Sequence, residues 1–582
     1  MILSSGTNFN LKRGEIRVFY GEITLDHDDT VRAWITCPGK AECLSVEGQN
    51  YLGEWFDKLD KKATANVPKR LWFYVKAPDA AGKYNGTITV TNTARKVLSH
   101  FSITLNVSNE VAEEDQFANG SDLRRLFWLN SKLGINNEVP KPYAPIEYDG
   151  KYVKVLGREI ELDEYGLPKR ITSHFGKDVT ISSDSYEVLS DRIKFTVGEE
   201  SFRIVSSGAT TDSDVFAFAS VSESDSFMMK IRARIEFDGF CDYKITLIAK
   251  RDAKVSNVNL CLPITDYSSE YFMGLGKEGG KFDGKLDFKW DSAKNQDGFW
   301  VGNVNAGIRV KFKSSNYKKP LTDEYYQKKP LVMPKSWDND GHGGIFYDSG
   351  SFFAYSDGFE LAYGKKLSFD FELSITPVKP INESFNSASA ANIPYGTKLN
   401  PYKNYPFFEE TELSDFISKA HSDGKKAIIY YTLRELTDKA PEFSAFADFD
   451  CELLEPAFEE LGSARIANGE SRICNFYAEA LDRLVEKHKI DGICLDGAEF
   501  DRNTMKRVRR ILDKRENAEV TLNTTPKFTE ESGFSSSLLI YTELLPYVDK
   551  LTVSASSEKS DAYKLVELSG IPFGIKADVK TN

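Results

Sequence analysis

The sequence predicts a multidomain protein of mixed class, with two β-rich regions ahead of a region of alternating strands and helices. Its 582 residues exceed what one hydrophobic core supports, so several domains are expected. Up to about residue 380, short alternating strands divided by turn residues predict an immunoglobulin-like β-sandwich and then a larger β-sandwich. From about residue 390, strand and helix patterns alternate, as they do in a (β/α)8-type, or TIM-type, barrel.

The first β region covers residues 1–107. The segments 15–20, 31–35 and 86–90 alternate or nearly alternate apolar and polar side chains, which is typical of strands with one buried face. Residues 108–145 are expected to be a linker and connector, because they begin with an acidic, polar stretch and end in a proline-rich one.

The second β region covers residues 146–380. Period-two runs at 229–235, 242–248 and 368–373, with turns between them, predict a larger β-sandwich. A region of this length is within the size that a single all-β domain reaches.

Residues 390–582 are expected to form the barrel domain. They fall short of the roughly 250 residues of a typical eightfold barrel, so we expect a barrel that is incomplete at its C-terminal side. Helical periodicity predicts the helices, and apolar runs predict the strands. The expected helices are 411–422, 474–488, 503–514, 535–545 and 560–568, and the expected strands are 426–431, 490–495, 519–523, 550–554 and 571–575.

A carboxylate at the end of the strand 490–495 is the leading catalytic candidate. Strand alternation puts Gly492, Cys494 and Asp496 on one face, so Asp496 is the last inward residue at the barrel mouth. Catalytic side chains of such barrels lie at the C-terminal ends of the strands. The alternative is that Asp496 only caps the helix that follows, as Asp often does.

Other polar residues near predicted strand ends complete the candidate site. Glu435 follows the strand 426–431, and Glu499 shares a loop with Asp496, so both are catalytic candidates beside it. The expected substrate-binding residues are Asn400, Tyr402, Asp501, Arg502 and Asn523. An ion pair between Asp501 and Arg502 is the structural alternative for those two, and the basic face of the helix 503–514 is expected to face solvent.

Composition narrows the class of partner. A net charge of −12 argues against nucleic acid and anionic membranes as binding partners, because both bind to basic surface patches. It favours a neutral carbohydrate as the substrate. Seven cysteines without a CxxC pair and six histidines without an HxxxH pair predict neither a metal site nor a cofactor. The sequence lacks a signal-peptide pattern and a long apolar run, so the expected location is cytoplasmic, or secreted if a leader is missing. The oligomeric state stays open.

Several stretches together resemble the multidomain proteins of the glycoside hydrolase family 123-like group. They are 126–135, 271–280, 295–302, 375–380, 399–402, 430–436, 491–502 and 571–574. The resemblance implies a β region ahead of a barrel and an N-acetyl-β-galactosaminidase activity. In that family an adjacent Asp–Glu pair works with the acetamido group of the substrate: the Asp polarises the acetamide and the Glu protonates the leaving oxygen.

The resemblance assigns the acetamide-orienting role to Asp496, while Gly497 stands where the family has its Glu. Two hypotheses follow. The first is a glycoside hydrolase acting on a neutral or N-acetylated sugar such as a β-N-acetylgalactosaminide, with Glu435 as the first choice for the acid. The second is a carbohydrate-binding or catalytically degenerate glycosidase-like protein.

Overall fold

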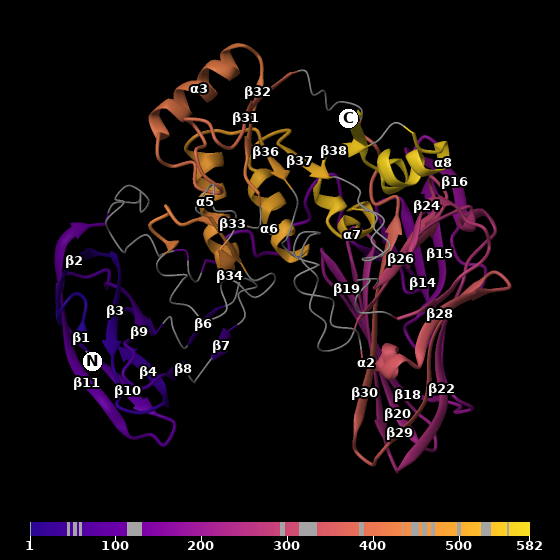
Figure 1. Cartoon of the computed structure of the whole chain (residues 1–582), viewed down its shortest axis with the longest axis horizontal. Coiled ribbons are helices and arrows are strands. Elements are labelled where there is room, and N and C mark those ends of the chain that lie inside the picture. The colour runs from indigo at the N-terminus through magenta and orange to yellow at the C-terminus, as the bar shows by residue number, and fades with distance from the viewer. Residues whose placement is uncertain are drawn as a thin grey trace. The chain divides into compact units, whose positions relative to one another are not determined.

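The chain was analysed as a computed structural model (Figure 1), which describes residues 2–43, 47–49, 55–57, 61–112, 128, 131–290, 297–313, 335–382, 389–432, 435–443, 453–456, 463–466, 472–496, 502–524, 537–555 and 558–581. Two compact units account for the chain. The first contains residues 1–135, 393–418 and 432–489, and the second contains residues 136–392, 419–431 and 490–582.

Two antiparallel-rich sheets of the first unit share one core. Their inward-facing residues include Phe19, Phe73, Ile88 and Leu105, all fully buried in one apolar cluster. The four-stranded sheet has the order β1 (Ile2–Leu3), β3 (Ile16–Ile23), β9 (Lys69–Lys76), β5 (Lys40–Cys43). The five-stranded sheet has the order β2 (Asn8–Arg13), β11 (Val97–Val111), β10 (Gly82–Asn92), β4 (Asp29–Thr36), β8 (Lys61–Ala63), and β6 (Glu47–Gln49) pairs with β7 (Trp55–Asp57).

The later segments of the first unit hold the helix α5 (Ile473–Glu486) and most of α3 (Glu410–Ser422). Glu410 ties the two together: its carboxylate accepts two bonds from Arg483 (2.8 and 2.7 Å) and one from His488 (3.1 Å). A three-stranded antiparallel sheet has the order β33 (Glu435–Thr437), β35 (Ser463–Ile466), β34 (Leu453–Pro456).

Three antiparallel sheets form the strand-rich part of the second unit. One has the order β12 (Glu147–Tyr148), β13 (Tyr152–Val155), β14 (Arg158–Leu162), β15 (Pro168–Phe175), β16 (Ile181–Glu187). Another has the order β17 (Lys194–Val197), β22 (Ala253–Pro263), β29 (Ser351–Leu361), β28 (Gly343–Asp348), β25 (Asp287–Lys289). The nine-stranded sheet has the order β18 (Arg203–Thr211), β19 (Val215–Glu223), β20 (Phe227–Glu236), β21 (Phe240–Ala249), β30 (Lys366–Thr376), β27 (Gly307–Lys313), β26 (Gly298–Gly302), β23 (Tyr271–Gly274), β24 (Lys277–Lys281).

Aromatic side chains join the nine-stranded sheet to the sheet that contains β29. Phe352 of β29 contacts Phe272 and Phe299, with ring centroids 5.8 and 4.7 Å apart. Phe195 of β17 contacts Phe369 of β30 at 5.6 Å. Aromatic pairs of this kind add stabilisation beyond the area they bury, so this part of the chain has its own core.

A curled parallel sheet forms the half-barrel of the second unit. Every neighbouring pair from β32 to β39 is parallel, and the intervening helices belong to crossovers of the βαβ type. Its strands, in sheet order, are β31 (Ala390–Ile393), β32 (Lys426–Tyr430), β36 (Gly492–Asp496), β37 (Glu519–Thr524), β38 (Lys550–Ala555) and β39 (Lys576–Thr581).

The two faces of this parallel sheet differ in polarity because side chains alternate along each strand. The residues of one face are apolar and buried, namely Ala427, Ile429, Ile493, Leu495, Val520, Leu522, Leu551 and Val553. The other face carries the more exposed polar residues Tyr430, Asp496, Thr521, Asn523, Thr552, Ser554 and Asp578, while Ile428, Gly492 and Cys494 on the same face are buried.

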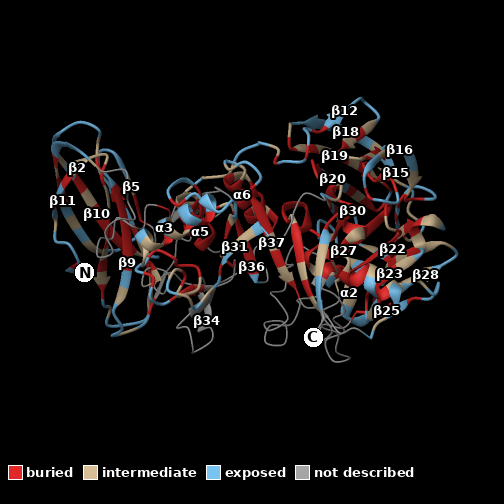
Figure 2. Cartoon of the chain, turned by 90° about the horizontal axis from the view of Figure 1, so that it is seen from above, coloured by how far each residue is buried: buried red, intermediate tan, exposed pale blue. Residues whose placement is uncertain are grey.

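The helix α6 (Arg502–Leu512) follows β36 and corrects one expectation. Its basic face was expected to meet solvent, but Arg502, Lys506 and Arg509 are buried (Figure 2). Acidic groups of the same unit receive them, because Lys506 bonds Glu236 (2.9 Å) and Arg509 pairs with Asp549 (2.6 Å).

Short helices complete the second unit. The expected strand 571–575 is wrong, because residues Ile571–Phe573 form a 3-10 turn and the strand begins at Lys576. The reason is local: Pro572 has no backbone N–H to donate to a neighbouring strand, and Gly574 adopts a φ of 79°.

The other short elements are α2 (Lys335–Asp338), α7 (Ser537–Tyr541), α8 (Asp561–Tyr563), a π-turn (Lys564–Leu568), and 3-10 turns at Tyr267–Ser269, Asn339–Gly341 and Leu545–Tyr547. Within the described residues, no helix is both long and apolar enough to cross a bilayer.

Candidate active site

The end of β36 places a carboxylate at the C-terminal edge of the parallel sheet. Asp496 is the last residue of the strand and is exposed, whereas Ile493 and Leu495 on the opposite face are fully buried. The lower part of the polar face is tightly packed at Gly492, where a Cβ atom would lie 2.2 Å from the carbonyl oxygen of Glu519. Any larger residue at this position would clash with the backbone of the neighbouring strand, so glycine allows the strand that carries Asp496 to pack there.

Tyr430 lies next to Cys494 in the strand register, and Asn523 lies next to Asp496. The phenol of Tyr430 interacts with the side chains of Cys494 and Asn523. Burial raises the pKa of Tyr430, and nearby Cys494 adds to that effect. Burial also raises the pKa of the Cys494 thiol to about 12, and the charge of Asp496 opposes its ionisation further. Both groups are therefore neutral at ordinary pH and act as hydrogen-bonding groups.

The register extends this site across four strands. Asp496 pairs with Asn523, Asn523 with Thr552, and Thr552 with Asp578. Parallel partners share a face, so these four side chains form one polar row. Lys550 holds the last of them through a 2.7 Å ion pair with Asp578.

This row offers the groups that recognise a sugar. A carboxylate accepts hydrogen bonds, an amide both donates and accepts, and hydroxyls do both. Groups of three or more His, Cys, Asp or Glu side chains arranged to hold a metal are absent from the part of the chain that the structure describes. The carboxylate, amide and hydroxyl groups of the row suit recognition of a neutral ligand by direct hydrogen bonds.

The structure brings two of the sequence-predicted residues together, Asp496 and Asn523. Glu499 and Asp501 lie outside the described residues. Glu435 is the first residue of β33, which pairs antiparallel with β35, and its side chain lies outside the described part as well.

Arg502 belongs to the predicted sugar-binding set, and its side chain makes contacts inside the protein. Its guanidinium donates to Glu236 (3.0 and 2.6 Å), to Asp238 (2.5 Å) and to the carbonyl oxygen of Glu543 (3.2 Å). It also stacks over Phe240 at 4.3 Å. With its donors engaged in the protein interior, Arg502 anchors the start of α6 and has a structural role.

Asn400 and Tyr402 belong to the first unit. Asn400 is fully buried, and its side-chain amide donates to the carbonyl oxygen of Ile393 (3.3 Å), which favours a structural role in a turn. Tyr402 is half-buried, with its ring edge-on to Phe408 at 5.4 Å.

Sequence reasoning did not select Tyr430, Thr552 or Asp578 as site residues. Each was visible in a predicted strand or just beyond one, but none follows a motif of its own. The period-two pattern of the neighbouring strands could have found Tyr430 and Thr552, because each shares its strand's polar face.

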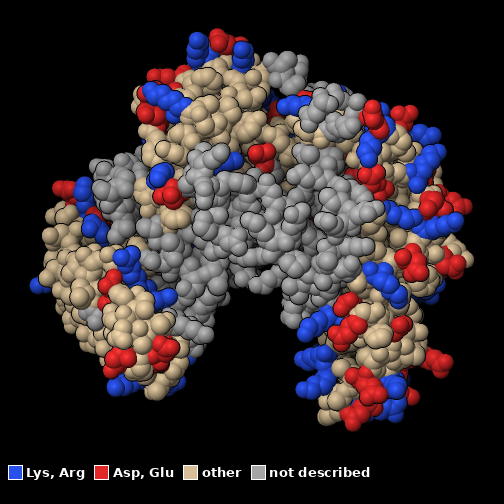
Figure 3. All heavy atoms as spheres, viewed as in Figure 1, with Lys and Arg blue, Asp and Glu red and all other residues tan. Residues whose placement is uncertain are grey.

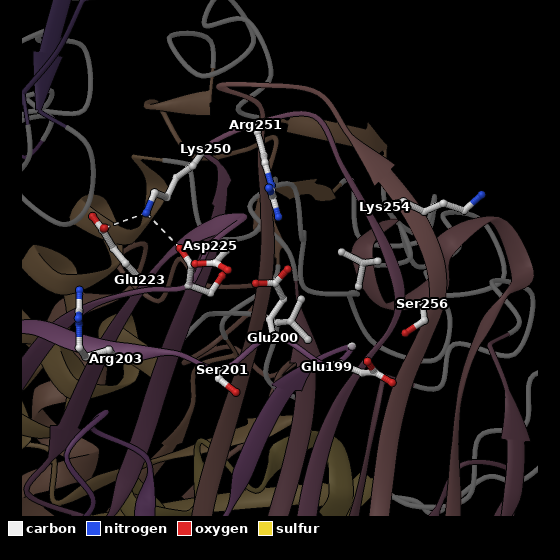
Figure 4. Close-up of a pocket in the computed structure, with 14 residues that line it drawn as sticks. Glu199, Glu200, Ser201, Arg203, Glu223, Asp225, Lys250, Arg251, Lys254 and Ser256 are labelled. Atoms are coloured by element: carbon white, nitrogen blue, oxygen red, sulfur yellow. Dashed lines mark hydrogen bonds and ion pairs between the residues drawn. The ribbon is translucent and has the colours of Figure 1, made fainter.

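A cavity of about 810 Å³ opens elsewhere in the second unit, among turns of the antiparallel sheets (Figure 4). In it, Lys250 bonds Glu223 (2.9 Å) and the carbonyl oxygen of Ser224 (3.0 Å). Burial alone would raise the pKa of Glu200, but hydrogen bonds from Ser224 and Ser226 lower it. A lowered pKa favours the ionised form over the protonated form that a general acid needs, so we place the candidate active site at the parallel sheet.

Domain models identify the family. Residues 146–377 match the third domain of glycoside hydrolase 123, and residues 371–462 and 458–582 match its TIM-barrel domain. No curated protein sequence matches the chain.

Solved structures give looser matches. A family 123 glycoside hydrolase from Clostridium perfringens, studied for glycolipid glycan hydrolysis, is 17% identical, with 18% of this chain and 23% of that chain covered and a TM-score of 0.14. The α-galactosidase from Lactobacillus brevis is 9% identical over 86% of this chain and 79% of that one, with a TM-score of 0.29. The galactosidase domain of an α-galactosidase–sucrose kinase is 8% identical over 75% and 83%, with a TM-score of 0.28.

The two domain models together cover residues 146–582, so the chain belongs to glycoside hydrolase family 123, a family of glycosidases.

Proposed function

We propose that the chain hydrolyses the glycosidic bond of a neutral or N-acetylated sugar, such as a β-N-acetylgalactosaminide, at the polar face of its parallel sheet. The observation that carries the proposal is the exposed carboxylate of Asp496 at a strand's C-terminal end, beside Asn523 and Tyr430. Active sites of barrel enzymes are built at this edge of the sheet.

In this proposal Asp496 contacts the reacting sugar. Glycoside hydrolysis needs negative charge close to the anomeric carbon as an oxocarbenium-like transition state forms. Asp496 supplies that charge directly as a nucleophile, or it orients an acetamido group whose oxygen attacks. Asn523 and Tyr430 then hold sugar hydroxyls or the acetamide through their amide and phenol groups.

A second carboxyl group must protonate the leaving oxygen. Gly497 stands next to Asp496 where the resemblance implies a Glu, so the acid must come from another position. Glu435 and Glu499 remain our candidates for it. Asp578 lies on the same polar row but is engaged by Lys550 at 2.7 Å, which favours a structural role.

The test is turnover of a panel of aryl glycosides that includes N-acetylgalactosaminide and galactoside, with wild type and two variants. Asp496→Asn should lower kcat and kcat/KM together by several orders of magnitude, because the change acts on the transition state. Its melting temperature should stay close to wild type, because Asp496 is an exposed side chain at the end of its strand. Asp191→Asn is the matched control, because Asp191 is an exposed carboxylate of the same unit outside the polar row, and it should keep the wild-type activity.

Two outcomes would redirect the proposal. Full turnover by Asp496→Asn would move the catalytic role to Glu435 with Glu499. Sugar binding by the wild type without turnover of any glycoside would favour the carbohydrate-binding, catalytically degenerate alternative, for which the Gly497 position is the specific observation.

A further inference from the structure

A solvent-facing sheet surface in the first unit carries an exposed tryptophan. Trp34 of β4 keeps 42% of its surface exposed, whereas Trp72, Trp128, Trp300 and Trp337 are almost completely buried. Trp34 alternates along β4 with Ala33 and Ile35, which face the core, so it stands on the outer face of the five-stranded sheet.

The strand register arranges the outer face into rows. Trp34 is opposite Thr89, which is opposite His100, and Thr36, Thr87 and Ser102 form the next row. Two further rows contain Asn85, Thr104 and Asn8, and then Lys83, Asn106 and Asn10. We call the uncharged members of these four rows the Trp34 face.

The Trp34 face is a layer of hydroxyl and amide groups that already bond one another. Thr36 Oγ1 lies 2.9 Å from Thr87 Oγ1, and Thr89 Oγ1 lies 3.0 Å from His100 Nδ1. Asn106 Nδ2 donates to Asn10 Oδ1 at 3.1 Å. Each such group retains further donor or acceptor capacity, because an amide has two donors and two lone pairs and a hydroxyl has one donor and two.

Charge is sparse across the middle of this face. In a chain with 28% charged residues, Lys83 is the one Lys, Arg, Asp or Glu of these four rows, and it stands at the end of its row. Arg32 lies in the adjoining row opposite Thr91, and the Lys12–Glu110 pair lies beyond the last row. The lobe formed by β1–β11 is largely uncharged on its left side in Figure 3, with charges mainly toward its margins. Nucleic acids and anionic lipids need a basic patch, so this surface suits neither.

We propose that the Trp34 face binds a neutral oligosaccharide or polysaccharide chain. One sugar ring stacks its apolar side on the Trp34 indole, and the next sugars hydrogen-bond to the rows of Thr, Ser and Asn side chains. A protein partner would favour an apolar centre rich in several aromatic or Arg side chains, whereas this face has one indole and one imidazole among hydroxyls and amides. The site is separate from the proposed catalytic residues and does not depend on their activity.

The test uses the full chain and affinity electrophoresis in gels that contain soluble neutral polysaccharides, namely galactomannan, arabinogalactan or a β-glucan, with polygalacturonate as the anionic probe. The wild type should be retarded by at least one neutral polysaccharide, equally at low and high salt. Trp34→Ala should weaken that binding by roughly tenfold or more, as loss of an aromatic anchor does. The matched control is Tyr363→Ala, at a residue 73% exposed in the second unit, and it should bind like wild type.

A second variant guards against misfolding. Ser102→Arg places bulk and charge in the middle of the face from an exposed position, and it should also abolish retardation while its melting temperature stays at the wild-type value. Turnover of soluble aryl glycosides should be unchanged in all variants, which separates this proposal from the catalytic one. The proposal is overturned if no neutral polysaccharide retards the wild type, if both face variants still bind, or if only polygalacturonate binds in a salt-sensitive way.

Discussion

At the scale of single residues, burial of Cys494 lowers the fraction of its reactive thiolate form beside the candidate carboxylate. Its side chain points to the same face as Asp496, yet burial raises its thiol pKa to about 12. The thiolate is the nucleophilic form of cysteine. Cys494 therefore packs the polar face as a small neutral group.

Alkylation with iodoacetamide at pH 8 should test this. The thiolate fraction of Cys494 in the folded protein should be roughly 10³-fold below that of an unperturbed thiol with a pKa of about 8.5. Peptide mass spectrometry should show Cys494 labelled only after urea unfolding. Cys37 is less buried, and burial raises its pKa only to about 11, so it should react first. Rapid labelling of Cys494 in folded protein would contradict the argument.

The same shift sets a pH dependence. The folded pKa of Cys494 lies above the unfolded one, so its contribution to stability is complete below about pH 8.5 and is lost as pH rises toward 12.

The sequence predicted correctly those features of single residues that depend only on the alternation of side chains along one strand. The alternation of β36 was enough to place Asp496 on the face of Gly492 and Cys494, and the strand 519–523 supplied Asn523. It could not supply the cross-strand register, which pairs Tyr430 with Cys494 and Thr552 with Asp578. Register depends on which strands pair, and one sequence does not state the pairing.

At the scale of elements, α6 shows why a charge pattern alone misjudged a helix. Its heptad-like basic stripe is the usual sign of a solvated face, but here the stripe meets Glu236 and Asp238, which lie more than 250 residues earlier in the chain. The helix itself was predicted within two residues of its bounds, since its apolar positions repeat at helical spacing. Its partners come from the strand-rich part, so no local pattern reveals them.

Removing the central acid of this cluster should destabilise the second unit. Burial alone would raise the pKa of Glu236, but the charges of Arg502, Lys506 and Arg234 outweigh burial and hold that pKa well below its usual range. Glu236→Gln leaves buried Arg502 and Lys506 undercompensated and should cost about 3–5 kcal/mol of unfolding free energy. Urea unfolding followed by circular dichroism measures the loss.

The matched control for this prediction is Glu223→Gln. Glu223 also pairs with a lysine, Lys250, at 2.9 Å, but both side chains are about one-third exposed. A pair of this kind contributes about 0–1 kcal/mol, so the control should unfold near the wild-type midpoint. Replacing Glu236, Arg502 and Lys506 by methionine, together with Asp238→Asn, should be milder than Glu236→Gln, because the acids and bases of this buried cluster are then removed together. Equal losses from Glu236→Gln and Glu223→Gln would refute the argument.

At the scale of the whole molecule, the strand-rich regions and the parallel sheet follow the order that the sequence predicted, but the compact units do not follow the chain in simple blocks. The first unit combines residues 1–135 with two later segments, and the second takes the remainder. Sequence composition marked the boundary near residue 107, whereas β11 continues to Val111. The domain boundaries at 107, 146 and 380 therefore stay predictions.

The first β region should be removable as a unit. All residues of its apolar core lie between Leu3 and Val107, so the core is closed within that segment. The next contacts belong to the connector: Trp128 packs edge-on against Phe476 at 5.5 Å, and Ser131 donates to Glu479. A variant lacking residues 1–120 keeps both contacts and should retain one cooperative thermal transition in scanning calorimetry, because few contacts cross a domain linker.

The full-length control Trp128→Ala should instead lose about 3–5 kcal/mol of unfolding free energy, since it opens a cavity at a fully buried side chain. If the truncated chain melts without cooperativity while Trp128→Ala melts normally, residues 1–120 are part of the fold of the rest and the boundary is misplaced.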